Sequence, residues 1–105
     1  MKDKVWVERV LGEVTKCRGM SSADEVEGVL KPILFEGYHQ LQRLGYMDSR
    51  DVQETFDYLD RMSFRIFPFV VKILQDLAHH ARVGSLKDSL LQASAQVEEI
   101  EALVS

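Results

Sequence analysis

The segment from residue 64 to residue 77 reads FRIFPFVVKILQDL and is the most apolar part of the chain. A helix with about 3.6 residues per turn gathers five of its side chains on one stripe: Ile66, Val70, Ile73, Leu74 and Leu77. Phe64, Phe67 and Val71 widen this stripe to roughly half of the helix circumference, beyond the ~100° of an ordinary surface helix. The pattern predicts either a central helix with several neighbours or a helix that forms a subunit interface.

Upstream of this segment, the sequence predicts two helices and the points where they begin and end. The apolar repeat of the first helix stops at Arg18-Gly19. Ser22, with Glu25 three residues later, is a capping box that starts the second helix. Pro32 lies inside the second helix, and its ring clashes with the carbonyl four residues earlier. We therefore expect a kink at Pro32 or two short helices end to end.

A third helix is expected after Gly45, which ends the second one. Asp48 or Ser49 can cap it by accepting a hydrogen bond from a backbone N–H of the first turn. Pro68 suits the first turn of a fourth helix, because proline lacks an N–H that this turn would leave unpaired anyway. The apolar stripe of the third helix carries Val52, Thr55, Phe56, Leu59 and Met62.

The C-terminal part of the chain predicts a fifth helix over residues 86–104. We expect the fourth helix to run to about Arg82 and to stop at Gly84, and Ser85 to open the fifth. Apolar residues then alternate in steps of four and three, as in a heptad repeat: Leu86, Leu90, Ala93, Val97, Ile100 and Val104. We call this row of apolar residues the C-terminal seam. It is typical of a straight helix that packs along other helices of the same chain, or of an arm that binds a partner chain.

Together these segments predict an all-α fold, a single domain over residues 1–105 built as an antiparallel bundle of four to five helices. With six glycines and two prolines in 105 residues, the chain is poor in the residues that a turn-rich all-β protein needs. The core is expected to centre on one set of apolar residues: Leu30, Ile33, Leu41, Val52, Phe56, Leu59, Ile66, Val70, Ile73 and Leu77.

Charge and cysteine content narrow the classes of function. The formal net charge is −4, which disfavours non-specific binding to a phosphate backbone. Cys17 is the single cysteine, so neither an intrachain disulfide nor a zinc site of cysteine pairs can form. The N-terminus becomes charged before a signal-peptide core accumulates, and no segment reaches the ~20 apolar residues of a membrane span. We expect a cytoplasmic protein that binds no membrane.

Two carboxylate–imidazole pairs are the strongest metal-binding candidates. Glu36 with His39, and Asp76 with His79, lie one helical turn apart and resemble half of the ligand set of a di-iron carboxylate bundle. The helical period, however, directs both histidines away from the apolar stripes of their helices. We therefore expect polar residues on solvated faces, with no metal and no other cofactor. The sequence also lacks a nucleophile motif and a glycine-rich phosphate loop, so we expect no enzymatic activity.

Residues 38–60 have the outline of a helix-turn-helix, which keeps a nucleic-acid-associated regulator as the alternative function. The second of these helices carries four carboxylates and two arginines. Carboxylates repel the phosphates that line a DNA groove, so direct nucleic-acid binding is not our preferred interpretation.

The surplus of apolar surface favours a small protein-interaction module: an adaptor, a chaperone or a regulatory subunit of a larger assembly. One small domain can hardly enclose both the wide stripe and the C-terminal seam, and large exposed apolar patches mark interaction sites. We expect a protein partner, a homodimer or both. The residues predicted to form the interface are Phe64, Phe67, Val71, Leu86, Leu90, Val97, Ile100 and Val104.

Overall fold

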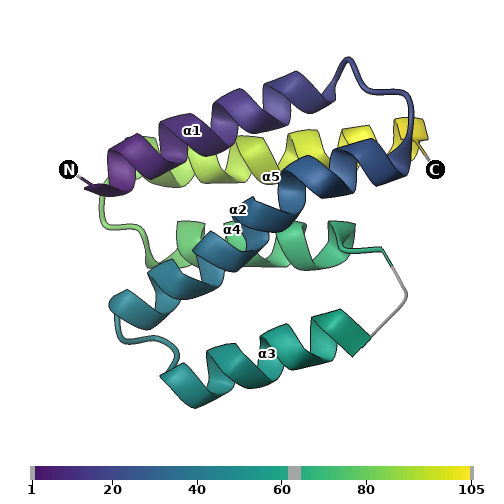
Figure 1. Cartoon of the computed structure of the whole chain (residues 1–105). Helices are drawn as coiled ribbons and strands as arrows, with labels where there is room; N and C mark the ends of the chain where they lie inside the picture. The colour runs from purple at the N-terminus through teal and green to yellow at the C-terminus, as the bar shows by residue number, and fades with distance from the viewer. Residues whose placement is uncertain (1, 62–64, 105) are drawn as a thin grey trace.

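The computed structural model describes residues 2–61 and 65–104, and this part of the chain consists of five helices without a strand (Figure 1). The helices are α1 (Lys2–Cys17), α2 (Ala23–Arg43), α3 (Ser49–Arg61), α4 (Phe67–His80) and α5 (Gly84–Val104). The all-α prediction is confirmed.

Four of the helices form a closed bundle, and α3 lies outside it. In the bundle, α1 packs against α2 and α5, and α4 packs against the same two helices. Helices that follow one another in the sequence run in opposite directions, whereas α1 and α5 run the same way (Figure 1). α3 packs against α2 and extends the bundle on one side.

The wide apolar stripe of the fourth helix belongs to the core of the chain. Because α4 lies between α2 and α5, its side chains are covered from two directions. Six of its residues are buried: Phe67, Val70, Ile73, Leu74, Leu77 and Ala78. The interpretation as a central helix therefore explains most of the stripe without a second chain.

Helix α2 approaches α4 closely because Gly37 has no side chain. A Cβ atom at Gly37 would lie 2.8 Å from Cγ1 of Ile73 and 3.6 Å from Cδ1 of Leu77. Carbon atoms normally pack at about 3.5–4.0 Å. Gly37 therefore sets the distance between the two helices at the centre of the core.

Local hydrogen bonds account for the starts of α2 and α3. The Ser22 hydroxyl accepts a hydrogen bond from the Glu25 N–H at 3.2 Å, and an Asp48 carboxylate oxygen accepts one from the Asp51 N–H at 2.8 Å. The side-chain caps at Ser22 and Asp48 are confirmed, whereas the return bond of the capping box, from the Ser22 N–H to the Glu25 side chain, is absent among the described residues. Pro32, in contrast, lies within one continuous helix, so of the two alternatives expected there, a kink or two short helices end to end, the second was wrong.

Gly45 ends α2 in the left-handed conformation, with φ at +86°. Its N–H donates to the carbonyl of Gln42, and the N–H of Tyr46 donates to the carbonyl of Leu41. This pair of hydrogen bonds is a Schellman motif, which favours glycine because other residues have a Cβ clash there. The turn brings Tyr46 back toward the end of the bundle.

The junction between α4 and α5 differs from the prediction. α4 ends at His80 because the backbone of Ala81 is extended, with ψ at 128°. Gly84 does not stop α4; it is the first residue of α5. The connection is therefore short, and Val83 occupies the capping position of α5.

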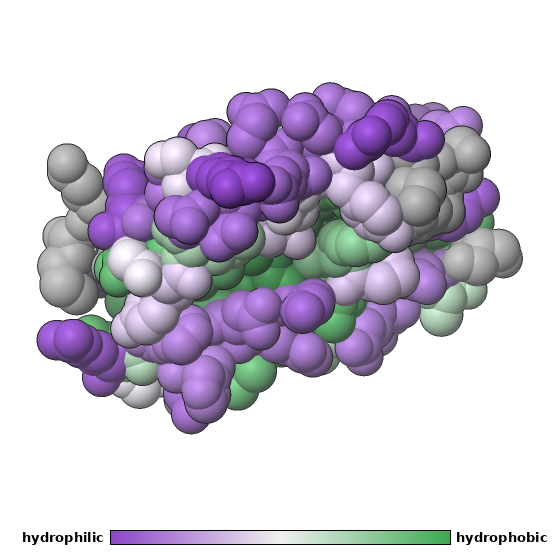
Figure 2. Space-filling model, turned by 90° about the horizontal axis from the view of Figure 1, so that it is seen from below, coloured by the Kyte–Doolittle hydropathy of each residue, from purple (hydrophilic) through white to green (hydrophobic). Residues whose placement is uncertain are grey.

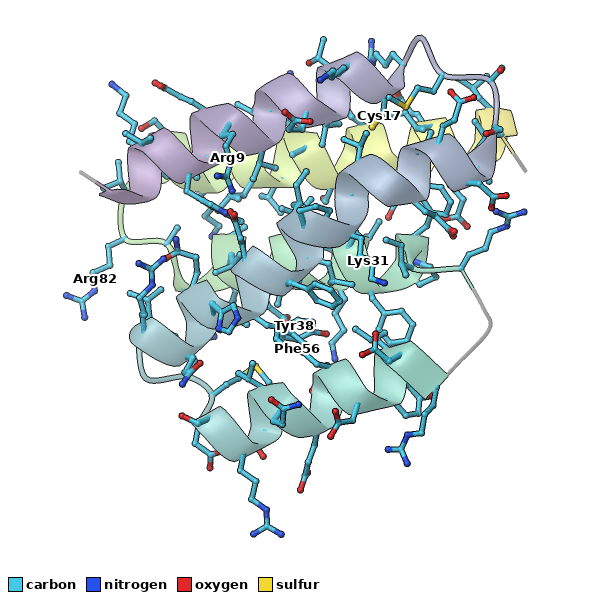
Figure 3. The ribbon with its side chains drawn as sticks, viewed as in Figure 1. Arg9, Cys17, Lys31, Tyr38, Phe56 and Arg82 are labelled. Carbon is cyan, nitrogen blue, oxygen red and sulfur yellow. The ribbon has the colours of Figure 1, made fainter. Side chains whose placement is uncertain are left out.

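Helix α3 contributes less to the core than its apolar stripe predicts. Val52 is its buried residue, whereas Phe56 and Leu59 are half-buried and Met62 lies outside the described residues. Phe56 packs beside Phe35 and Tyr38 of α2, with ring centroids 4.6 and 6.1 Å apart (Figure 3). Placing Phe56 and Leu59 at the centre of the core was wrong, because α3 covers one side of α2 instead of entering the bundle. Ile66, also expected there, is partly buried next to α4.

Candidate binding pocket at one end of the bundle

The predicted interface residues fall into two groups in the structure. Phe67, Leu90, Val97 and Ile100 are buried inside the chain, because α5 packs along α1 and α4. Three others are partly exposed: Val71, Leu86 and Val104. Phe64 lies outside the described residues. The C-terminal seam is thus core of this chain rather than the surface of a projecting arm.

The four metal-binding candidates have other neighbours. Glu36 forms an ion pair with Arg9 and accepts a hydrogen bond from the indole N–H of Trp6 at 2.9 Å. His39 packs edge-on against Phe56, and His79 lies beside His80. Asp76 is near Tyr38, and this proximity together with burial, the larger cause, raises the pKa of the Tyr38 hydroxyl. Across residues 2–61 and 65–104, no three His, Cys, Asp or Glu side chains gather at a metal-binding spacing.

The segment with a helix-turn-helix outline consists of the end of α2, the Gly45 turn and α3. The exposed face of α3 carries four carboxylates: Asp51, Glu54, Asp57 and Asp60. Arg50 on the same helix is paired with Glu54 at 3.2 Å. Figure 2 shows an apolar groove between two polar bands on the face of the molecule seen from below. The pocket between α3 and the bundle is lined partly by Asp51 and Glu54.

An apolar pocket of about 560 Å³ opens at the end of the bundle where α1 begins and α4 ends; we call it the end pocket. This volume lies within the ~300–1,000 Å³ range of typical ligand sites. Its apolar interior is formed by buried side chains from α1, α4 and α5: Trp6, Val7, Leu77 and Leu90. Four further apolar residues surround its mouth: Leu44, Tyr46, Val83 and Leu86. The remaining lining residues are Gln40, His80, Ala81 and Arg82.

Two side-chain contacts hold the pocket wall in place. The rings of Tyr46 and His80 are stacked, with centroids 3.7 Å apart and planes at 15°. This stack joins the turn after α2 to the last turn of α4. The hydrogen bond from Trp6 to Glu36 joins α1 to α2 in the same way. The pocket is therefore built from helix ends that are fixed to one another.

Gln40 is the polar residue of the pocket interior. It is 8% exposed and lines the pocket, and among the described residues the buried side-chain oxygen without a hydrogen-bond partner is Oε1 of Gln96, not an atom of Gln40. The Gln40 carboxamide is therefore open to solvent through the pocket, and covering it with an occupant that does not pair with it would cost ~1–3 kcal/mol. Gln40 therefore offers a donor and an acceptor to a group inside the pocket.

Arginine is the charged residue of the pocket lining. α5 begins there without an acidic residue in its first turn, and its first backbone bonds run from Leu86 and Lys87 to the carbonyl of Val83. The N–H groups of Gly84 and Ser85 have no acceptor among the described residues. Arg82 projects outward beside them (Figure 3) and forms no ion pair with the described residues. The lining contains no Asp or Glu.

The sequence alone does not identify this site. Gln40 lies next to the apolar stripe of the second helix, and no motif in the sequence marks it as a binding residue. The sequence pattern places Arg82 in the last turn of the fourth helix and starts the fifth helix two residues too late, at residue 86 instead of Gly84. The informative signal is Val83, because valine is a poor helix cap and leaves backbone N–H groups unpaired.

In the described residues, no helix is both long enough and apolar enough to cross a lipid bilayer. The chain matches no known family model, no curated protein and no solved structure.

Proposed function

We propose that the chain is a small protein-interaction module whose binding site is the end pocket. A partner protein inserts an apolar side chain from a helix or a short segment, and the mouth of the pocket packs against the residues on either side of it. The role is that of an adaptor, a chaperone or a regulatory subunit. We place it in the cytoplasm, where the free, buried thiol of Cys17 suits the reducing environment.

The observation that carries this proposal is the exposed apolar rim of the end pocket. Leu44, Tyr46 and Val83 are 48%, 46% and 41% exposed, and all three lie at one mouth. Single exposed apolar residues are ordinary, whereas a cluster around an apolar pocket is typical of a protein-binding surface. Burying the cluster against a partner would remove it from water, which stabilises the complex by ~25 cal/mol per Å² of apolar area.

The depth of the pocket supports an anchored mode of binding. Behind the rim, the interior reaches Trp6, Leu77 and Leu90, which belong to three different helices. Interfaces commonly depend on a few large side chains that fill such a pocket. Helix-in-groove contacts supply these anchors at intervals of one helical turn.

Selection of binding peptides from a displayed random library tests the proposal before any partner is identified. Selected peptides should share a large apolar residue, and Leu44→Asp should abolish their binding, because the new carboxylate would have to be buried. Leu44 is exposed, so this variant should remain folded. Leu103→Asp is the matched control, since Leu103 is a 79% exposed leucine on the last turn of α5.

Two results would contradict the proposal. One is a selection that yields no specific peptide. The other is a set of peptides whose binding survives Leu44→Asp but is lost in a variant of α3 or of the C-terminal turn. Light scattering identifies a second copy of the chain as the partner: a dimer of the wild type that Leu44→Asp dissociates would assign the rim to self-association.

A further inference from the structure

We infer that the segment bound in the end pocket is acidic, with a carboxylate placed directly beside its apolar anchor. This inference rests on the proposed function and adds the chemistry by which the partner is recognised. Three separate observations at the pocket support it: the Gln40 carboxamide in its lining, the uncapped start of α5, and the charge of the lining residues.

Gln40 indicates that the occupant is polar at one point within the pocket. Gln40 lines the pocket beside apolar side chains, and its carboxamide is open to the pocket instead of being buried without a partner. An amide can donate and accept at once, so it can pair with a peptide group or donate to a carboxylate through its NH₂. A purely apolar occupant would bury this amide unpaired and bind less well.

The start of α5 indicates that this polar group carries negative charge. The unpaired N–H groups of Gly84 and Ser85 lie between Val83 and Leu86, both of which line the pocket. The N-terminus of a helix attracts anions through these N–H groups and through the helix dipole. No acidic side chain in the first turn of α5 competes for this position.

The charges of the residues around the pocket also favour an acidic occupant. The chain carries 17 Asp and Glu in 105 residues, yet none lines the end pocket. Arg82 lines it, and the carboxylate of Glu36 on α2 is neutralised by its ion pair with Arg9. A guanidinium without an ion-pair partner can hold a carboxylate through paired hydrogen bonds. An acidic segment is therefore complementary to the mouth, and a basic one is repelled.

Fluorescence anisotropy with a matched peptide series tests this inference. Short amphipathic peptides share the same apolar anchors and carry Glu, Gln or Lys beside them, with both ends blocked. At low salt the Glu peptide should bind roughly tenfold more tightly than the Gln peptide, as expected for a charge-assisted hydrogen bond. The Lys peptide should bind most weakly, and added salt should reduce the differences.

Variants of the protein locate the carboxylate. Arg82→Ala and Val83→Asn should each remove most of the preference for the Glu peptide, the second because the uncharged asparagine side chain caps the N–H groups of α5. Arg61→Ala is the matched control, since Arg61 is an exposed arginine at the end of α3, and it should leave the preference unchanged. Gln40→Leu should weaken the Glu and Gln peptides alike.

Equal binding of the Glu and Gln peptides, with both sensitive to Leu44→Asp, would overturn the inference and leave the proposed function standing. A preference for Glu that survives Arg82→Ala and Val83→Asn would also overturn it, because the carboxylate would then bind elsewhere. If none of the peptides binds, both the inference and the proposed function are wrong.

Discussion

Replacing Gly37 with alanine should destabilise the protein, although alanine is the better helix former. The new Cβ would lie 2.8 Å from Cγ1 of Ile73, about 1 Å closer than two carbon atoms normally pack. Ile73 cannot move aside easily, because a β-branched side chain in a helix has one strongly preferred rotamer. The two helices must therefore separate, or Ile73 must leave its preferred geometry.

The size of the effect follows from two opposing contributions. Overpacking in a close-packed core lowers the free energy of unfolding by ~1–3 kcal/mol. Replacing a helical glycine with alanine raises it by ~0.5–1 kcal/mol. Gly28→Ala isolates the second contribution, because Gly28 lies on the same helix and a Cβ there would meet nothing within 4 Å. Gly28→Ala should therefore stabilise the chain, and the two variants should differ by the overpacking cost, ~1–3 kcal/mol.

Urea unfolding followed by circular dichroism measures both free energies. In the Ile73→Ala background, Gly37→Ala should raise the free energy of unfolding instead of lowering it. The reason is that removal of the Ile73 side chain beyond Cβ makes room for the new methyl group. The close approach of α2 and α4 would be refuted if Gly37→Ala proved at least as stable as Gly28→Ala, or if the Ile73→Ala background left its effect unchanged.

Further predictions concern the start of α5, Cys17 and α3. Val83→Asn should raise the free energy of unfolding by ~1 kcal/mol, because the asparagine side chain caps α5. Chemical denaturation measures this free energy. An unchanged or lower value would show that the N–H groups of α5 are already satisfied. Burial raises the pKa of the Cys17 thiol, so the folded chain holds the thiol proton more tightly than the unfolded chain does. The resulting stabilisation is fully present below the unfolded pKa of about 8.5 and is lost as the pH rises above that value. Comparison of the wild type with Cys17→Ala should show a smaller decline in stability for the variant between about pH 8 and pH 9.5, and parallel declines would contradict the assignment. Amide hydrogen exchange should be faster in α3 than in α2 or α4, because α3 has a single buried side chain, Val52; equal protection of α3 and α4 would be inconsistent with its position outside the bundle.

The fold was predictable from the sequence where the determining interactions are local. Ser22 and Asp48 cap their helices with their own side chains, and Gly45 adopts the conformation that ends α2. These effects depend on residues three or four positions apart, so a single segment specifies them. The helical periods likewise identify the apolar face of each segment.

Periodicity does not identify what covers an apolar face, and the incorrect expectations have this origin. Phe56 and Val97 lie on equally clear stripes, but Phe56 is half-buried between α3 and α2 whereas Val97 is fully buried. The difference arises because α5 packs along α4 and α1, and α3 packs against α2. Only the arrangement of helices in space decides which stripe becomes core.

The candidate site could not be predicted from the sequence either, because it depends on how the helices are arranged in space. Gln40, Leu77 and Val83 come from two helices and a loop that meet only in the folded chain. None of them belongs to a motif, and Gln40 is notable because apolar side chains from other helices surround it. A pocket formed by helix ends has no signature in any one segment.

The central claim is that the end pocket receives the apolar anchor of an acidic partner segment, and methyl NMR of the protein with the Glu peptide tests it most directly. Saturating peptide should shift the methyl signals of Leu77, Leu86 and Leu90 and give intermolecular nuclear Overhauser effects between them and the anchor residue. The methyl signals of Leu103, exposed on the last turn of α5, should stay in place. Shifts and Overhauser effects at Leu103 or along α3, with the three pocket leucines unchanged, would contradict the account.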